Sequence, residues 1–446
     1  MLRRKFRAFV IVASALIVGA SPVSAAAPTI SANAYGTIGG GGATFPLAQY
    51  TKWFSTFTRI NSEVRPITTG KSLAQFSSSD ATNSLVLSYA GSSSGTGISN
   101  FYGATRRASA QMFSGSDSVL TSANRTSIEG TDISTNYTVI PATAGPISIG
   151  YNLPGLKLKT GAAAATIRLD GETLCGIYSG QIQKWNDDKL KAINPTVALP
   201  DADITVVGRS NTSGTTFIFA SYLGRAATAA QKMCGYHSSF VSNSTDNFDG
   251  AAGTFKPVNT QPGTYFGAMR TALGANAIVG QSSNQYIAEY IRDNANTIGY
   301  VETSYIASTR IKDAAIAARS TTGGASATKV YLKPTAATVT AALTNAVTGE
   351  DPINPTTAFV QPVYAAGTNS YPIVGYSWWL IYTRYTDATV RKGQVEGMIA
   401  FMNWALTTGQ STTNLADGFT PLPAAVRTAA INELHRIQWN GAVVWP

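Results

Sequence analysis

Three short segments rich in glycine and hydroxyl side chains constrain this chain more than any other feature of its sequence. They read GGGGATFP at residues 39–46, AGSSSGTG at 90–97 and GRSNTSGTTF at 208–217. The last follows the apolar run 204–207, and Pro46 in the first is suited to the first turn of a helix. Backbone N–H groups at a helix start lack partners within the helix and attract anions, and glycine lets the backbone approach closely. An ordinary capped helix would explain one such segment, but three together predict a shared site for one small anion.

Strand-like apolar runs alternate with stretches of helical spacing along the chain. The clearest helix is 395–406, where Val395, Met398 and Met402 share one face and Gly409 follows the end, as expected of a core-packing helix. Such alternation predicts α/β layering. The strand-like runs are 85–89, 138–140, 147–152, 204–207, 298–301 and 373–382.

The length and composition predict two domains with substantial cores. The chain has 446 residues, of which 44% are hydrophobic. No repeat of fixed period is visible, which excludes solenoids and propellers. Two segments rich in Ala, Thr and Ser, 308–329 and 336–357, have weak patterning. They are predicted to be surface insertions.

The N-terminal residues 1–25 are predicted to be a cleaved secretory signal peptide. Four basic residues at positions 3–7 precede the apolar run 9–20 and then small residues, and the pattern fits the general and the twin-arginine routes. No other stretch reaches the roughly 20 apolar residues of a membrane span, and no cysteine offers a lipid attachment site at the cleavage point. Without the four basic residues, 29 basic residues face 23 acidic ones, so the mild excess of +6 favours anionic ligands.

The cysteines and histidines are too few for most metal or catalytic sites. Cys175 and Cys234 lie 59 positions apart, and in an exported chain they are expected to form a disulfide rather than a metal site or a catalytic pair. His237 and His435 are the only histidines and lie in no cluster with metal-ligand spacing. The sequence therefore predicts no metal and no cofactor.

Charged and hydroxyl side chains within these segments complete the candidate anion site. The guanidinium of Arg209 is a planar fork suited to a tetrahedral oxyanion, and the hydroxyls of Ser213 and Thr215 add donors. In FSGSDSVLT, residues 113–121, Asp117 follows an apolar position in a small-residue loop. Taken alone, this aspartate would be read as a helix cap or a turn residue.

Several ordered motifs resemble those of the phosphate-binding proteins of phosphate ABC importers, and more closely those of their DING-type relatives. The matching motifs run in the family's order from residue 39 to about residue 426, so a coincidence is implausible. They are Gly41–Pro46, Gly115–Ser118, Leu174–Gly180, Lys184–Trp185, Arg209–Thr215, Ile298–Glu302, Tyr371–Ile373 and Pro421–Pro423.

The resemblance implies a type II periplasmic-binding-protein fold, in which two α/β lobes are joined by a two-strand hinge and clamp the ligand between them. Lobe I is expected to comprise residues 29–140 and 371–446, and lobe II residues 141–370 with an insertion at about 308–357. The two chain crossings are expected near 137–149 and 370–375.

The resemblance also implies a ligand set for inorganic phosphate. Ser92 is placed in this set by the family spacing, with Ser93 as the alternative if the loop is shifted by one residue. Where transport members of the family have an acid two positions after the arginine, this chain has Asn211, so Arg209 loses an orienting ion pair or is oriented by another group. The full set is Thr44, the backbone N–H of Phe45, Ser92, Asp117, Arg209, Ser213, Gly214 and Thr215.

An acid in an anion site has a physical explanation in the proton that phosphate carries near neutral pH. An ionised Asp117 accepts a hydrogen bond from that proton, whereas sulfate has none and would meet an unpaired, repelling, buried charge. The sequence therefore predicts selectivity for phosphate.

The expected protein is an exported, monomeric phosphate binder, periplasmic or secreted, with an ABC permease as its expected partner and no affinity for nucleic acid. A secreted phosphatase is the main alternative, but no motif pairs Ser213 with a general base. The other alternative is a phosphate-responsive extracellular interaction protein, which sequence does not separate from a transport component.

Overall fold

The computed structural model describes most of the chain after residue 27. The described residues are 28–31, 34–60, 64–66, 85–102, 111–118, 120, 136–163, 166–225, 262–319, 329–350, 358–387 and 390–446. The predicted signal peptide, Cys234 and His237 lie outside them.

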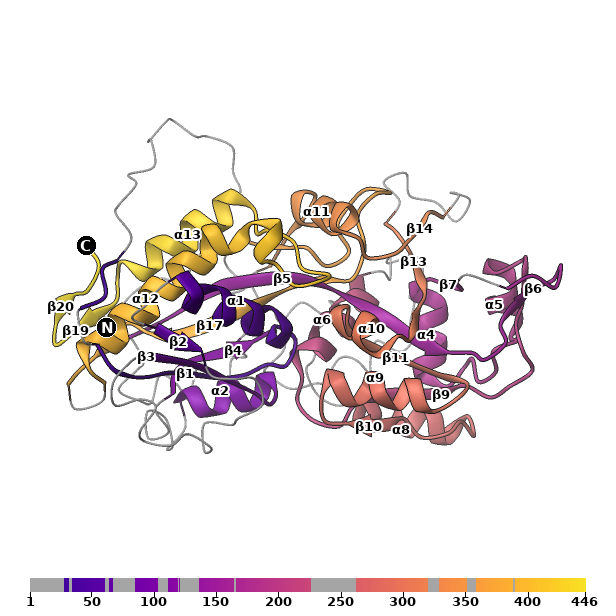
Figure 1. Ribbon diagram of the computed structural model, residues 1–446. Coiled ribbons are helices and arrows are strands. Elements are labelled where there is room, and N and C mark those ends of the chain that lie inside the picture. Colours follow the sequence, from indigo (N-terminus) through magenta and orange to yellow (C-terminus); the bar gives the residue numbers. More distant parts are fainter. Residues whose placement is uncertain are drawn as a thin grey trace, which may run out of the picture.

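One long strand, β5 (Tyr137–Asn152), runs through the middle of the molecule and belongs to both halves of a ten-stranded sheet (Figure 1). Its first part pairs antiparallel with β17 (Val374–Tyr382) as far as Pro146. From Ile147 onward it pairs antiparallel with β11 (Thr297–Glu302). The sequence predicts two separate strands here, at 138–140 and 147–152, whereas the structure joins them into one.

A second chain segment crosses beside β5 at the same point. The N–H of Ile147 donates to the carbonyl of Ile373 at 2.8 Å, and the hydroxyl of Tyr371 donates to the carbonyl of Ile147 at 2.8 Å. The two connections between the halves therefore lie side by side and are hydrogen-bonded to each other.

Lobe I, the half that contains both termini, has the strand order β2-β3-β1-β4-β17-β5. β1, β3 and β4 are parallel neighbours, so their carboxyl ends share one edge of the sheet. In Figure 1 the helices α1, α12 and α13 cover one face and α2 lies on the other. The remaining elements of lobe I are β1 (Gly36–Gly42), α1 (Leu47–Ile60), β2 (Val64–Pro66), β3 (Leu85–Gly91), α2 (Ser94–Tyr102), β4 (Gln111–Ser116), β18 (Arg384–Tyr385), α12 (Lys392–Leu406), the 3-10 turns η2 (Thr408–Gln410) and η3 (Thr412–Asn414), α13 (Ala424–Leu434), β19 (Gln438–Trp439) and β20 (Ala442–Val443).

Lobe II continues the sheet in the order β5-β11-β9-β10, with β12 also paired to β5. β9 is parallel to both β11 and β10, so its carboxyl end reaches the same edge as theirs. Its further elements are β6 (Lys157–Leu158), β7 (Arg168–Leu169), α4 (Gly171–Ser179), α5 (Asp188–Ile193), β8 (Val197–Ala198), β9 (Thr205–Arg209), α6 (Gly214–Arg225), α8 (Pro262–Ala272), β10 (Val279–Gln281), α9 (Asn284–Asp293), α10 (Ser304–Thr309), β12 (Lys312–Asp313), β13 (Ala315–Ala317), β14 (Tyr331–Leu332), α11 (Ala336–Thr344), β15 (Val347–Glu350) and β16 (Ala358–Gln361).

Parts of the segments 308–329 and 336–357 are buried, which contradicts the expectation of surface insertions at these positions. β13 pairs with β7 and β14, and Ile316 is fully buried. α11 begins with a capping box at Thr335 and buries Val339 and Leu343. The weak pattern misled the sequence analysis because small residues such as alanine fill these contacts.

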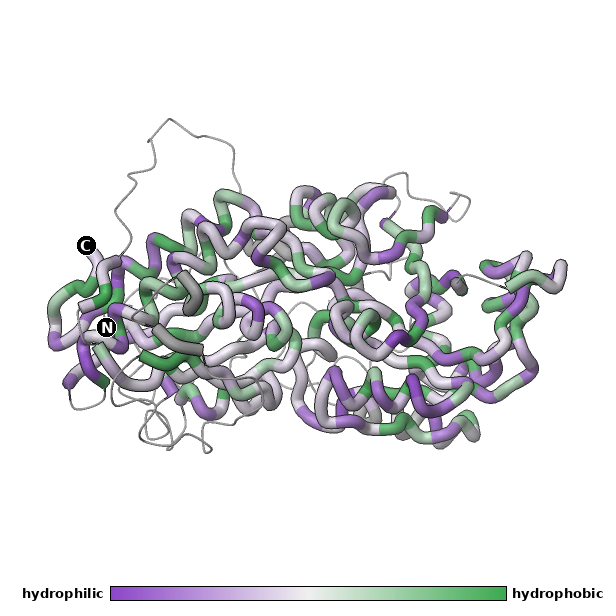
Figure 2. The backbone as a smooth tube through the Cα atoms, in the orientation of Figure 1, coloured by the Kyte–Doolittle hydropathy of each residue, from purple (hydrophilic) through white to green (hydrophobic). Residues whose placement is uncertain are grey.

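Aromatic side chains form the core of lobe I under the edge where β1, β3 and β4 end. Tyr50 stacks on Trp53 and Trp379 at centroid distances of 6.1 and 6.0 Å and meets Tyr89 edge-on at 4.8 Å. The indole of Trp53 donates to the carbonyl of Gly409 at 2.8 Å, which fixes α1 to the turn η2 that follows α12. Hydrophobic residues, green in Figure 2, occur throughout both lobes.

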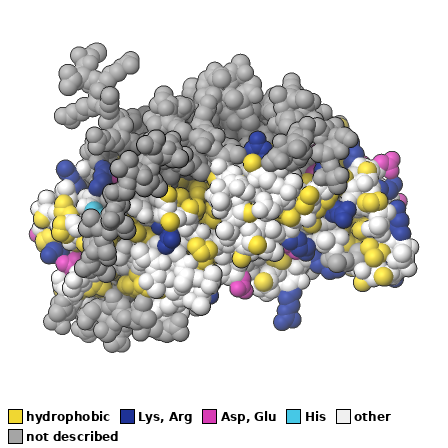
Figure 3. Space-filling model, turned by 90° about the horizontal axis from the view of Figure 1, so that it is seen from above, with side chains coloured by type: hydrophobic (Ala, Val, Ile, Leu, Met, Phe, Trp, Pro, Cys, Tyr) yellow, Lys and Arg dark blue, Asp and Glu magenta, His cyan; other side chains and the backbone are white. Residues whose placement is uncertain are grey.

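The basic side chains do not gather in one patch on the face seen in Figure 3, where they are scattered and lie beside acidic ones at one end. On lobe II, Lys184 pairs with Asp201 at 2.7 Å and Lys191 with Asp188 at 2.8 Å. No helix in the described part of the chain is long and apolar enough to cross a membrane.

Candidate anion-binding site

Glycine packing brings the ends of two lobe I strands and the first turns of helix α2 together. Gly42 has φ +137°, and a Cβ there would lie 2.1 Å from the carbonyl oxygen of Gly115. A Cβ on Gly97 would lie 2.5 Å from the same oxygen, so the ends of β1 and β4 and the first turns of α2 touch backbone to backbone. This close approach explains the glycine-rich sequence. It places Thr44, Ser94 and Asp117 at the carboxyl edge of the sheet, where α/β proteins bind ligands.

Asp117 directly follows β4 and is buried, with 3% of its surface exposed. Its Oδ1 accepts a hydrogen bond from the hydroxyl of Ser377 at 2.7 Å, and its Oδ2 accepts one from Ser94 at 3.4 Å. Burial raises the pKa of the carboxyl from 3.8 to about 7, although the Ser377 hydrogen bond and the positive charge of Arg209 lower it. Near neutral pH this side chain can therefore accept a proton or release one.

Arg209, the last residue of β9, brings a buried positive charge from lobe II. Its Nη1 donates to the hydroxyl of Ser213 at 2.8 Å and its Nη2 to the carbonyl of Ser282 at 2.9 Å. Its Nε donates to Oδ1 of Asn211 at 3.1 Å, so a hydrogen bond to a neutral amide orients the guanidinium in place of the ion pair ascribed to transport members of the family. Burial lowers the pKa of Arg209.

The N-terminus of α6 meets Asp117 across the lobe boundary. The N–H of Gly214 donates to the hydroxyl oxygen of Ser94 at 3.0 Å, and the N–H of Asp117 donates to the same oxygen at 3.1 Å. A Cβ on Gly214 would lie 2.5 Å from the Cβ of Asp117, so only glycine permits this contact. The oxygen of Ser94 thus occupies a position where two backbone donors from different lobes converge.

Asn284, the first residue of α9, joins two hydroxyls of the predicted set. Its Nδ2 donates to Oγ1 of Thr44 at 3.2 Å and to Oγ1 of Thr215 at 3.1 Å. Its Oδ1 accepts from the N–H of Glu302 at 3.2 Å. The hydroxyl of Tyr305 also contacts Thr44, donating to its carbonyl at 3.3 Å. All of these contacts to Thr44 come from lobe II.

Within the described residues, Ser92 and Phe45 are the predicted positions without a hydrogen bond to the rest of the group. The hydroxyl of Ser92 donates to the carbonyl of Gly42 at 3.3 Å, and in the part of the chain that the structure describes it has no hydrogen bond to the other predicted residues; α2 begins two residues later, at Ser94. The alternative, Ser93, caps α2 by accepting from the N–H of Thr96 at 3.1 Å. The serine of this loop that joins the group is Ser94. Phe45 lies beside Thr44 just before α1, and its ring packs edge-on against Phe419.

A second buried acid, Glu302, lies close to this group. Burial raises its pKa from 4.5 to about 8, and the negative charge of Asp117 adds to the increase. Its Oε1 accepts from the N–H of Ser304 at 2.9 Å, and its Oε2 accepts from the Ser304 hydroxyl. Sequence analysis counted Glu302 only as part of a family motif.

The structure thus brings together six of the eight predicted residues, from both lobes, and Phe45 adjoins them only as the neighbour of Thr44. Within the described residues, no group of His, Cys, Asp and Glu could hold a metal ion. What remains is a buried cluster of N–H and O–H donors with the cation Arg209 and the protonatable acid Asp117, and with Glu302 close by, which suits an oxyanion that carries a proton.

This combination of fold and site defines a class, the two-lobe α/β binding proteins of the periplasmic type. The sequence pattern described as the PBP superfamily domain matches residues 27–408. Phosphate-binding protein PstS of Methanocaldococcus jannaschii is 30% identical over 305 residues, which are 67% of this chain and 67% of the relative. The chain belongs to the PBP superfamily and, within it, to the family of phosphate-binding proteins.

Further relatives and solved structures agree. Phosphate-binding protein PstS of Haemophilus influenzae is 29% identical over 286 residues, which are 64% of this chain and 69% of the relative. The crystal structure of a DING protein matches with TM-score 0.60 and 22% identity, covering 91% of this chain and 96% of that one. The structure of a high affinity periplasmic phosphate-binding protein bound with phosphate matches with TM-score 0.56 and 23% identity, covering 88% and 92%. These structural likenesses confirm the expected fold.

Side chains that contact the predicted set but were not predicted from the sequence include Ser94, Asn284, Tyr305 and Ser377. Ser94 lies within a segment that was singled out, but the exact start of α2 was not readable. Asn284 and Ser377 come from elements far from the glycine-rich segments, and no local pattern marks an asparagine or serine as facing a site.

Cys175 is buried in α4 and is not a free cysteine. Its pairing with Cys234, which lies outside the described residues, stays a prediction.

Proposed function

We propose that this chain binds inorganic phosphate between its two lobes. The observation that carries the proposal is the meeting of buried Asp117 from lobe I with buried Arg209 and Gly214 from lobe II. Residues this polar are buried together only when partners satisfy them, and a hydrogen phosphate ion offers both acceptors and a donor. The relatives named phosphate-binding protein PstS support the same ligand.

The proposed ligand set keeps seven of the residues named from sequence and replaces Ser92 with Ser94. Two backbone N–H groups, of Asp117 and Gly214, donate to the oxygen of Ser94. A phosphate oxygen accepts hydrogen bonds in the same way, so we expect it to take over these donors when the Ser94 side chain turns. The set is Thr44, the N–H of Phe45, Ser94, Asp117, Arg209, Ser213, Gly214 and Thr215.

Asp117 is proposed to select phosphate over sulfate. In its ionised form the carboxylate accepts the phosphate proton, and in its protonated form it donates to an unprotonated phosphate oxygen, so the complex contains one shared proton in either case. Sulfate has no proton near neutral pH, so it can form a hydrogen bond only with the protonated carboxyl of Asp117. The raised pKa, about 7, keeps both forms accessible at neutral pH.

We propose a binding protein rather than a hydrolase. A nucleophilic serine needs a base within hydrogen-bond reach of its hydroxyl. Among the described residues, the Ser213 oxygen has only donors as partners, namely Arg209 and the N–H of Thr216 at 3.3 Å. The lobes also meet directly across the site, where Gly214 bonds to Ser94 and Asn284 to Thr44, so we expect no room for the organic group of an ester.

The proposed cellular role is supported by the family and by the predicted signal peptide. We propose an exported monomer, periplasmic or secreted, that passes phosphate to an ABC permease. The lobe limits from sequence, residues 29–140 with 371–446 and 141–370, are part of this proposal. The change of β5 partner after Pro146 supports a boundary within this strand, six residues later than the limit at residue 140.

Isothermal titration of the purified mature chain with phosphate, arsenate and sulfate tests the proposal. We expect phosphate to bind with one ion per chain, arsenate to compete because it shares the geometry and the proton, and sulfate not to bind at pH 8.5. Heat from sulfate equal to that from phosphate, or no heat from phosphate, would contradict it. Release of product from a chromogenic phosphate ester, abolished by Ser213→Ala, would favour the hydrolase instead.

A further inference from the structure

We propose that Asn284 is a positioning residue that turns two site hydroxyls into donors aimed at the anion. The inference rests on the proposed function and adds to it a residue outside the ligand set. Its basis is the pair of hydrogen bonds from one buried amide nitrogen to Oγ1 of Thr44 in lobe I and Oγ1 of Thr215 in lobe II.

The amide is itself fixed, so its donors and acceptor are assigned by their partners. Oδ1 must face the N–H of Glu302, which is a donor only, at 3.2 Å. The NH₂ group therefore faces the two threonines, and an amide with oxygen and nitrogen exchanged would point a donor at a donor.

The Oγ1 atoms of Thr44 and Thr215 therefore both act as hydrogen-bond acceptors toward Asn284. A hydroxyl has one hydrogen to donate and lone pairs to accept with, and here a lone pair of each oxygen receives an amide hydrogen. Within the described residues, neither Oγ1 has an acceptor for its own hydrogen. Both hydrogens are thus left available for an anion, which accepts and cannot donate at most of its oxygens.

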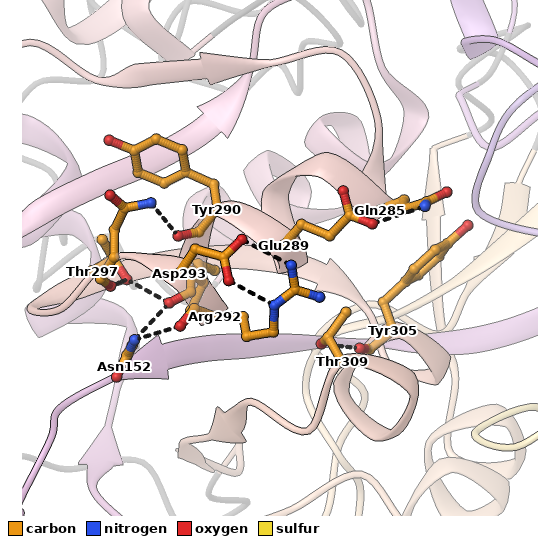
Figure 4. Close-up of polar contacts among 11 residues, drawn as sticks. Asn152, Gln285, Glu289, Tyr290, Arg292, Asp293, Thr297, Tyr305 and Thr309 are labelled. Carbon is orange, nitrogen blue, oxygen red and sulfur yellow. Dashed lines mark hydrogen bonds and ion pairs between the residues drawn. The ribbon is translucent and has the colours of Figure 1, made fainter.

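Hydrogen bonds at both ends of α9 hold the helix that carries Asn284. Ser283 caps the helix by accepting from the N–H of Tyr286 at 3.1 Å. At the other end, Asn152 of β5 donates to the carbonyls of Ile291 and Arg292 at 2.9 and 3.0 Å, as Figure 4 shows. A rigid helix therefore holds the amide in place and needs no ordering when the ligand binds.

The outer face of α9 supplies a matched control. Gln285, the next residue, is exposed and donates to Glu289 at 2.9 Å (Figure 4). A change there alters the same helix, one position along, without touching the threonines.

The test measures the phosphate Kd of the full mature chain by titration at pH 8.5 for the wild type, Asn284→Leu, Asn284→Asp and Gln285→Leu. We expect Asn284→Leu to weaken binding about thirtyfold, the effect of losing the orientation of two hydrogen bonds. Asn284→Asp should weaken it more, because a carboxylate accepts the threonine hydrogens and repels the anion. Gln285→Leu should leave the Kd within about twofold.

A mutant cycle distinguishes positioning from a merely structural role. If Asn284 acts through the threonines, the loss from Asn284→Leu should shrink from about thirtyfold to about fivefold when Thr215→Val has already removed one hydroxyl. An unchanged loss in that background, or a wild-type Kd in Asn284→Leu, would overturn the inference. Failure of the wild type to bind phosphate would instead overturn the proposed function, so the two failures are distinguishable.

Discussion

Replacing Asp117 with asparagine should admit sulfate to the site. Asparagine has the size of aspartate, and its Oδ1 can still accept the hydrogen bond that Ser377 donates to Asp117 at 2.7 Å in the wild type. The change replaces an acceptor-only carboxylate with a group whose NH₂ can donate to a sulfate oxygen. In the wild type at pH 8.5, above the pKa of about 7, the carboxyl is mostly ionised and repels sulfate.

The size of the effect follows from the burial of this carboxyl. A buried ionised group that faces an unprotonated anion lacks a partner and costs about 3 kcal/mol or more, which is about a hundredfold in affinity. We therefore expect the sulfate Kd of Asp117→Asn to be at least a hundredfold lower than that of the wild type at pH 8.5. Phosphate should lose only about tenfold, because a neutral acceptor replaces a charged one.

The assay is competitive titration of phosphate against sulfate, with Asp188→Asn as the matched control. Asp188 lies on α5, and its side chain is 96% exposed, so the control removes the same charge far from the site. A pH series supplies an independent check: sulfate affinity of the wild type should rise as the pH falls through about 7, whereas Asp117→Asn should show no such rise. Sulfate that still fails to bind a folded Asp117→Asn protein would refute the role given to this acid.

Three further predictions concern the same region. Arg209→Lys should lower phosphate affinity about a hundredfold, since an ammonium cannot reproduce the fork that reaches Ser213 and Asn211; titration of an otherwise stable variant checks it, and a loss below threefold would contradict it. Gly214→Ala should weaken binding at least about tenfold because its Cβ would lie 2.5 Å from that of Asp117, whereas Gly267→Ala, where a Cβ meets nothing within 4 Å, should bind normally; equal affinities would argue against direct contact of the lobes. The stability of the ligand-free protein should fall as the pH rises from 5 to 8.5. Asp117 and Glu302 have raised pKa values of about 7 and 8, so over this range the folded state holds protons that the unfolded chain has released. Glu302→Gln should flatten the slope of melting temperature against pH, and a slope identical to that of the wild type would exclude this cause.

Much of the fold was predictable because its signals are local. The runs 85–89, 204–207, 298–301 and 373–382 all fall within or beside observed strands, and the helix at 395–406 is the greater part of α12. Hydrophobic periodicity reports burial over a few residues, and here local preference and tertiary packing agree. The continuity of β5 was not readable, because two prolines interrupt the apolar pattern: Pro141 beside a register shift in the pairing with β17, and Pro146 where the strand changes partners.

The site was predictable to the extent that chemistry and glycine content mark it. Arg209, Asp117 and the hydroxyls of Thr44, Ser213 and Thr215 stand next to glycines that the packing requires. Ser94 was missed because Ser92, Ser93 and Ser94 are chemically equal, and only the start of α2 decides which one faces Asp117.

The shared strand β5 also sets an order in which the two lobes can be completed. All strands of the lobe II half of the sheet lie between residues 147 and 313. Because synthesis starts at the N-terminus, every strand of this half has been made well before the chain is finished. Lobe I is different: β4 and β5 are joined only by β17, which begins at Val374. On that side β4 therefore lacks its partner until nearly the whole polypeptide has been made, so lobe I is completed after the sheet of lobe II.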